Sequence, residues 1–232
     1  VANLYGPGLA SEYAGKEGWK PIEPGDVCWE DINGDNKING LDREVVGNIF
    51  PKVTGGFSST LSWKGISLYA RFDYALGHTL YNDLAARTLG QYQGAFNIIT
   101  EVKDMWSEDN PNSDLPAFYY ADQLAKKNIT RSNNASASRH NNSSRLYEKA
   151  DYLALRELTL SWDLPKAWTS KAFIQNASVY VTRQNLFYVT GYTGTSPEPV
   201  LTNSDNNENL YGVDQGRYPT PRTVLFGLSV TF

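Results

Sequence analysis

Residues 55–77, GGFSSTLSWKGISLYARFDYALG, alternate apolar and polar side chains on both sides of a Lys-Gly pair. Such alternation places every second side chain on the same face of a β-strand, and a two-residue connection joins two antiparallel strands in a hairpin. One face of the second strand would be apolar, with Ile66, Leu68, Ala70, Phe72, Tyr74 and Leu76. Its other face would carry Ser67, Tyr69, Arg71 and Asp73. The stretch therefore predicts a hairpin with one apolar face and one face that can meet water.

Three later segments repeat this alternation. Including the hairpin, the predicted strands are 54–64, 66–76, 151–164, 177–189 and 222–232. The sequence thus predicts an all-β fold with about five antiparallel strands. In the fourth strand, unbroken alternation would place Arg183 and Asn185 on the apolar face, so we expect a β-bulge that resets the alternation there.

The connections between these strands alternate in length. The Lys64-Gly65 turn and the segment 165–176 are short, whereas the connections at about 79–150 and about 190–217 are long. Short turns at one end and long loops at the other are typical of outer-membrane β-barrels, in which the turns face the periplasm and the loops face the exterior. We therefore expect the chain to supply C-terminal strands of a large antiparallel transmembrane barrel with long extracellular loops.

Three predicted strands run in the same direction. Each carries an aromatic residue on the apolar face, near the end of the sheet at which the short turns lie. These residues are Trp63, Trp162 and Phe232. Aromatic side chains line the membrane–water interfaces of transmembrane barrels. We predict that the three lie at one height on the lipid-facing side, near the periplasmic boundary.

The composition excludes several other classes of protein. The chain has 232 residues, of which 41% are hydrophobic and 13% aromatic, so it is not a disordered tail. Its formal net charge of −4 argues against nucleic acid as a partner, because binding to phosphates needs a basic surface. The single cysteine, Cys28, cannot form an internal disulfide. No apolar run approaches the roughly 18 to 20 residues of a transmembrane helix, which excludes helical spans only.

Few residues offer catalytic chemistry. His78 and His140 are the only histidines, and neither lies near Cys28 in the sequence. A glycosidase would need two carboxylates that converge in a cleft, and no such pair stands out. The sequence therefore predicts that the protein is not an enzyme.

Residues 1–53 are rich in Gly and Pro and are predicted to form an extracellular loop region before the strand region, 54–232. Within this region, the run DINGDNKINGLD at 31–42 has the ligand spacing of a calcium-binding EF-hand loop. The predicted ligands are the side-chain oxygens of Asp31, Asn33, Asp35 and Asp42 and the backbone carbonyl of Lys37. Two positions depart from the pattern, since Asp42 replaces a longer Glu and Asn36 replaces the usual Gly. We predict a structural Ca2+ or Mg2+ ion here, with a solvated, metal-free turn rich in Asp and Asn as the alternative.

Candidate ligand-binding residues lie on the polar face of the hairpin and in the first long loop. Flat aromatic rings beside amides and acids are suited to binding carbohydrate. The candidates are Tyr69, Arg71 and Asp73 on the polar face, and Trp106, Tyr119 and Tyr120 in the loop. For each of them, packing within the protein is the alternative role.

Five blocks of sequence carry a resemblance to a known family. The longest is PGDVCWEDINGDNKINGLDREVVGNIFPKVTGGFSSTLSWKGISLYARFDYALG at 24–77. The others are MWSEDNPNSDLP, SRLYEKADYLALRELTLSWDLPK, VYVTRQNLF and the ending YPTPRTVLFGLSVTF. In the same order and over most of 24–232, these blocks resemble the C-terminal barrel region of SusC/RagA-type TonB-dependent outer-membrane transporters.

The resemblance implies a large barrel in the bacterial outer membrane, in contact with membrane lipid and occluded by an N-terminal plug. It also implies a SusD-like surface lipoprotein as a lid, energy supplied through TonB, and import of oligosaccharides or peptides. The plug, the TonB-contacting segment and most barrel strands would precede Val1, so the N-terminal remainder of the same transporter is an expected partner. The lack of a signal peptide at Val1 then says nothing about the compartment.

Two other functions fit parts of the pattern. A secreted β-sandwich carbohydrate-binding module stabilised by calcium would also have alternating strands, and a surface glycosidase would need the carboxylate pair described above. The unequal connections and the terminal Phe232 favour the barrel over the sandwich. Five strands are too few to close a membrane barrel, which needs about eight, so we expect both outer strands to pair with strands that this chain does not contain.

Overall fold

The computed structural model describes residues 24–25, 30–35, 41–89, 99–117, 144–200 and 211–232. The chain divides into two compact units, which are Val1–Gly47 with Tyr81–Tyr147, and Asn48–Leu80 with Glu148–Phe232. No helix within the described ranges is long and apolar enough to cross a membrane.

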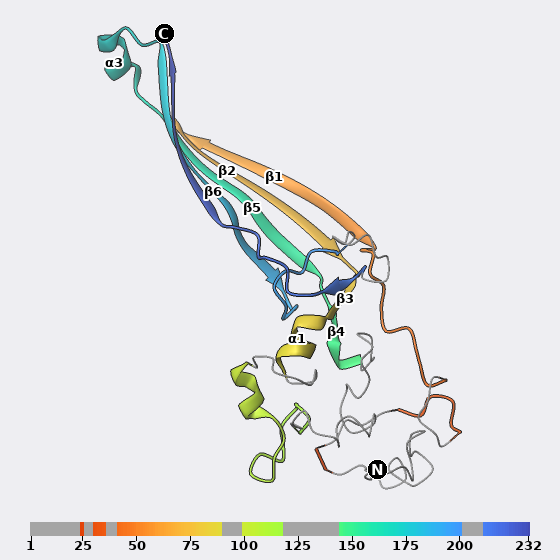
Figure 1. Ribbon diagram of the computed structural model, residues 1–232. Helices are drawn as coiled ribbons and strands as arrows, with labels where there is room; N and C mark the ends of the chain where they lie inside the picture. The colour runs from red at the N-terminus through yellow and green to blue at the C-terminus, as the bar shows by residue number, and fades with distance from the viewer. Residues whose placement is uncertain (1–23, 26–29, 36–40, 90–98, 118–143, 201–210) are drawn as a thin grey trace. The chain divides into compact units, whose positions relative to one another are not determined.

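A five-stranded antiparallel sheet forms most of the second unit, with the strand order β1-β2-β5-β6-β8 (Figure 1). Its strands are β1 (Val53–Trp63), β2 (Ile66–Leu76), β5 (Tyr152–Asp163), β6 (Asn176–Thr190) and β8 (Thr223–Thr231). All five predicted strands are therefore confirmed, with small differences at their ends. Each strand pairs with the next strand of the sheet along the chain, as in a meander.

The turn between β1 and β2 has the predicted form. Lys64 and Gly65 both adopt positive φ angles, 48° and 84°. Positive φ at both central residues defines the type I′ turn, whose twist matches that of the strands it joins. This turn and the short helical segments α3 (Lys166–Thr169) and η4 (Ser170–Ala172) lie at the same end of the sheet, because they connect β1 to β2 and β5 to β6. The long connections therefore all lie at the other end.

One face of the sheet is apolar and exposed. Leu61 is 72% exposed, Trp63 is 68% exposed and Phe226 is 83% exposed. The rings of Phe57 and Phe72 stack on this face with their centroids 4.9 Å apart. A continuous exposed apolar surface of this kind marks contact with a membrane or with another protein.

Trp63 and Trp162 lie in one row across this face, because both pair with Ile66. The row ends at Leu228 of β8, and Phe232 directly follows the last residue of that strand. Barrel strands are tilted, so a row across the sheet rises along the barrel axis. That the three aromatic residues lie at one height stays a prediction.

β5 and β6 depart from regular pairing at one level of the sheet. The register shifts between Leu155 and Glu157, and Arg156 has no paired residue in β2. In β6, Asn185 and Leu186 lie opposite this break without paired partners. Asn185 has a φ of 52°, in the left-handed region that Asn tolerates better than most residues. The expected bulge in the fourth strand is therefore present.

The bulge does not remove Arg183 from the apolar face. Arg183 pairs with Leu158 of β5 and with Val224 of β8, and paired residues share a face. Its side chain is exposed there. The expectation that the bulge resets the alternation was wrong, because β6 inserts two residues, and an insertion of two leaves the alternation unchanged.

Short elements make up the remainder of the described chain. They are β3 (Thr79–Asn82), α1 (Asp83–Thr88), η2 (Thr100–Asp104), η3 (Ser144–Leu146), β4 (Tyr147–Lys149) and β7 (Val213–Asp214). The three strands form a small sheet in the order β4-β3-β7. The two predicted long loops are thus partly ordered into short strands and helical turns.

Two small apolar clusters lie in the second unit. Leu80, Ala150, Tyr192 and Val200 form one of them. Ala75, Tyr152 and Ala154 form the other, with Tyr188 packed against it. Both clusters lie at the end of the large sheet from which the long connections begin. Side chains are therefore buried at this end, whereas the apolar face of the sheet is exposed.

Candidate functional site

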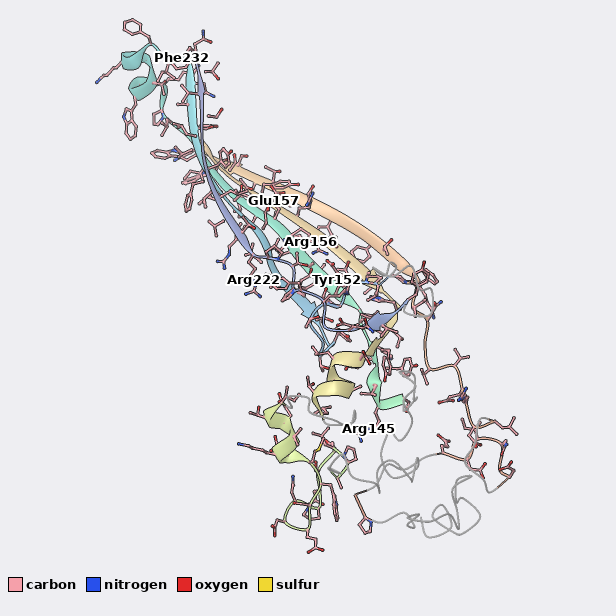
Figure 2. All side chains as sticks on the ribbon, in the orientation of Figure 1. Arg145, Tyr152, Arg156, Glu157, Arg222 and Phe232 are labelled. Atoms are coloured by element: carbon pink, nitrogen blue, oxygen red, sulfur yellow. The ribbon has the colours of Figure 1, made fainter. Side chains whose placement is uncertain are left out.

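A cluster of charged and aromatic side chains lies on the polar face of the large sheet. It consists of Asp73 of β2, Tyr152 and Arg156 of β5, Tyr188 of β6 and Glu198 of the following loop, and we call it the Arg156 cluster. Asp73 and Tyr188 both pair with Ala154, whose small side chain separates them. Figure 2 shows Tyr152 and Arg156 on β5. The bulge at Arg156 thus places its guanidinium between groups of β2 and β6, the two strands that flank β5.

The guanidinium of Arg156 binds two carboxylates. Its Nε and Nη2 donate to the two oxygens of Asp73, the latter over 3.0 Å. Nη2 also donates to Oε1 of Glu198 over 2.6 Å, and Nη1 donates to the Tyr188 hydroxyl over 2.7 Å. The side chain of Arg156 is 17% exposed, against 33% for Asp73 and 31% for Glu198. Such forked, charge-assisted contacts fix geometry as well as adding stability.

The two tyrosines complete the cluster. Tyr188 donates its hydroxyl to Glu198 over 2.8 Å, and Tyr152 donates to Asp73 over 3.2 Å. The Arg156 guanidinium lies 5.1 Å from the ring centre of Tyr188 and 5.9 Å from that of Tyr152. These are cation–π distances. One cation faces two carboxylates, so the cluster carries excess negative charge and can still accept hydrogen bonds from a hydroxyl or amide.

A buried aspartate organises the loop that provides Glu198. Asp214 is 0% exposed and accepts hydrogen bonds from the Tyr192 hydroxyl over 2.9 Å and from the Gly216 amide over 3.1 Å. Burial raises the pKa of the Tyr192 hydroxyl above its usual value, and the Asp214 carboxylate raises it further. Tyr192 therefore stays protonated and remains a donor. Arg217 in turn donates to the Glu198 carbonyl over 2.7 Å.

His78 holds the same loop from the end of β2. It is 1% exposed, and its Nε2 lies 2.8 Å from the carbonyl oxygen of Pro197. Because a carbonyl only accepts, Nε2 carries the proton. The loop around Glu198 is therefore fixed by His78, Arg156 and Arg217, so the carboxylate is held in place.

The structure brings one of the predicted cargo-binding residues into the Arg156 cluster. Asp73 is a member, whereas Tyr69 and Arg71 lie on the same face opposite Thr159 and Glu157, outside it. Trp106 belongs to the other unit, where its ring lies close to Gly25, and its part in cargo binding stays a prediction. Tyr119 and Tyr120 lie outside the described residues.

Sequence reasoning missed Arg156, Tyr188 and Glu198. A signal for Arg156 was present, because the outward leucines change their spacing from two to three between Leu155 and Leu158. A change of this kind indicates a bulge. No comparable signal marks Glu198, which lies in the loop after β6 and is 42 residues from Arg156 in the sequence.

The predicted metal loop forms hydrogen bonds typical of Asp- and Asn-rich turns. Oδ1 of Asp31 accepts from the Gly34 amide over 2.8 Å, and Oδ1 of Asn33 accepts from the Asp35 amide over 2.9 Å. Asp42 accepts from the Ile32 amide over 3.2 Å, which joins the two ends of the loop. In the described part of the chain, no three His, Cys, Asp or Glu side chains gather as a metal site, and Lys37 lies outside that part. The metal stays a prediction.

Removal of two candidate ligands tests this site. We expect the full-length protein to bind Ca2+ with a Kd of about 10⁻⁴–10⁻³ M, the range of extracellular modules. The double substitution Asp31→Asn and Asp35→Asn should abolish that binding, measured by isothermal titration calorimetry. Asp109→Asn, in another exposed loop, is the matched control and should bind normally. Equal calcium binding by the double variant and the control would exclude this loop.

Comparison with known proteins gives consistent matches. The chain is 30% identical over 213 residues to TonB-dependent receptor P3 of Formosa agariphila, covering 90% of this chain and 19% of the receptor. It is also 30% identical over 213 residues to TonB-dependent receptor P26 of the same organism, covering 91% of this chain and 20% of that receptor. No protein-family model matches the chain.

Solved structures of a transporter align with the same region. The RagAB peptide transporter superposes with a TM-score of 0.63 and 26% identity, covering 91% of this chain and 21% of that one. The RagAB peptide importer in its closed-closed state gives a TM-score of 0.62. The resemblance to a SusC/RagA-type barrel and the antiparallel β fold are therefore confirmed, and the relatives are receptors and transporters rather than enzymes. The chain spans about a fifth of the length of the relatives it matches.

Proposed function

We propose, from the homology of this chain to part of the TonB-dependent receptors, that it forms a section of the wall of a TonB-dependent outer-membrane importer. In this proposal the apolar face of the large sheet contacts lipid and the polar face lines the lumen. The long connections face the exterior, where they contact a SusD-like surface lipoprotein. TonB would act on the N-terminal remainder of the same transporter, which holds the plug and the other strands.

The sheet itself is the observation that carries the proposal. Its apolar face is widely exposed, and its opposite face holds the Arg156 cluster at the end where the long loops begin. Lipid-facing apolar residues that alternate with polar residues facing the interior are the pattern of membrane barrels. A secreted β-sandwich would bury its apolar face against a second sheet, and no such sheet covers it among the described residues.

The cargo is proposed to be an oligosaccharide or a peptide. RagAB is named as a peptide transporter, which favours peptides. The Arg156 cluster offers carboxylate acceptors beside tyrosine rings, and both features suit peptide amides as well as sugar hydroxyls. Asp73 and Glu198 are the residues of this chain that we expect nearest to the cargo.

Uptake by living cells tests the function. Deletion of the gene that contains this chain should abolish uptake of one labelled class, either oligopeptides or oligosaccharides, and the wild-type gene should restore it. Dissipating the proton-motive force should stop the same uptake, because TonB-dependent transport draws on it. Unchanged uptake of both classes in the deletion strain would contradict the proposal.

A further inference from the structure

Arg183 stands out on the apolar face of the sheet. It is the one charged residue among the paired residues of that face in the five strands, and the other paired residues there are apolar, aromatic, glycine or serine. β6 lies between β5 and β8 in the sheet, so no further strand can pair beside it. Among the described residues, no carboxylate forms an ion pair with its guanidinium. The charge therefore needs a partner from outside the described sheet.

Relative to β8, the register places Arg183 near the end of the sheet from which the long loops begin, although its row continues through Leu158 and Ala70 to Ser59, near the middle of their strands. β8 has 9 residues, about the length that a strand needs to cross a bilayer. Arg183 pairs with Val224, the second residue of β8, and Gln184 pairs with the first. This is the end at which the long loops begin. An arginine side chain near the boundary extends its guanidinium to the polar interface while its stem stays in the apolar layer.

A second arginine lies close to the same edge. Asn185, in the bulge of β6, donates its side-chain amide to the Pro221 carbonyl over 3.0 Å. This bond holds the chain before β8 against β6, and Arg222, the next residue, lies two residues before Val224, the partner of Arg183. Arg222 is exposed, and Figure 2 shows it at the start of β8. Phe187 and Phe226, also exposed, lie on the apolar face on either side of Arg183.

We propose that Arg183 and Arg222 form a binding site for the phosphate groups of an anionic lipid in the outer leaflet. The inference rests on the proposed membrane position of the sheet. Guanidinium groups bind phosphate through two parallel hydrogen bonds, which makes arginine the preferred residue for such a site. The acyl chains of the same lipid would lie against Phe226 and the apolar residues below it. The lipid thus supplies the counter-charge that the described sheet lacks.

Native mass spectrometry of the full-length transporter in zwitterionic detergent tests the site. Bisphosphorylated lipid A and lipid A without phosphates serve as the two probes. We expect the wild-type protein to retain the phosphorylated probe and the double variant Arg183→Leu, Arg222→Leu to bind it at least about tenfold more weakly, as expected for loss of charge-assisted hydrogen bonds. Arg71→Leu, on the polar face, is the matched control and should bind like wild type.

The outcomes separate this inference from the proposed function. A spin label on Leu228→Cys, in a cysteine-free background, reports whether the apolar face meets lipid. If the spin label lies in lipid and the double variant binds the phosphorylated probe as tightly as wild type, the lipid site is overturned and the membrane position stands. A label in water would overturn the membrane position on which the site depends. Equal binding of the two probes by the wild-type protein would show that phosphate is not recognised, which also overturns the site.

Discussion

Replacement of Arg156 with methionine is expected to lower the free energy of unfolding of the full-length protein by about 2–4 kcal/mol. Methionine keeps the apolar stem but leaves the carboxylates of Asp73 and Glu198 without their shared cation. Both carboxylates are about one-third exposed, so water screens part of their repulsion and the cost falls below that of a fully buried pair. The loss of stability is measured by unfolding in urea. The folded fraction at each urea concentration is read from the heat-dependent electrophoretic mobility of the barrel.

Two further variants make this prediction specific. Arg71→Met removes an exposed arginine from the same face outside the cluster, and should cost less than about 1 kcal/mol. Adding Asp73→Asn and Glu198→Gln to Arg156→Met should restore much of the stability, because no unpaired carboxylate then remains. If Arg156→Met and Arg71→Met were equally stable, the cluster would have no special role in holding the loop.

Residues 1–232 produced alone are expected to aggregate. Within the described residues, β1 and β8 are the outer strands of the sheet and have no partner along their outer edges. Unpaired backbone groups cost several kcal/mol each in hydrocarbon, so an open edge cannot persist in a bilayer, and in water it pairs with other copies. The exposed apolar face adds to this tendency. Sedimentation and size-exclusion chromatography of the product in plain buffer measure the outcome.

Co-production with the preceding part of the proposed transporter provides the control. We expect the two pieces together to yield a membrane-inserted barrel in which β1 pairs with a preceding strand and β8 closes against the first strand. A monodisperse monomer of residues 1–232 that melts cooperatively in plain buffer would contradict the barrel. That result would favour the calcium-stabilised sandwich instead.

The sheet could be predicted from sequence because its pattern is local. Alternation in 55–77 determines the hairpin, its faces and its turn, and Lys64-Gly65 adopts the conformation that such turns require. The same rule located β5, β6 and β8. Each of these predictions depends only on neighbouring residues, and tertiary contacts did not override them.

The site depends on contacts between distant segments, which alternation does not report. Glu198 meets Arg156 from the loop after β6, which contacts of Asp214, His78 and Arg217 hold in place. The position of Arg183 likewise depends on how many residues the bulge inserts. One inserted residue would have turned the rest of β6 over, whereas two did not.

The bulge at Arg156 also bears on how the sheet assembles. Without residue 156, β5 would alternate regularly from Tyr152 to Asp163, so the fold itself does not need the extra residue. A strand with regular alternation can slide by two positions along its neighbour and still present leucines to lipid. In β5 such a slide would move the bulge away from Asn185 and Leu186 and separate Arg156 from Asp73. We therefore expect the inserted arginine to disfavour slides of this kind during strand pairing, which the hydrophobic pattern alone would tolerate.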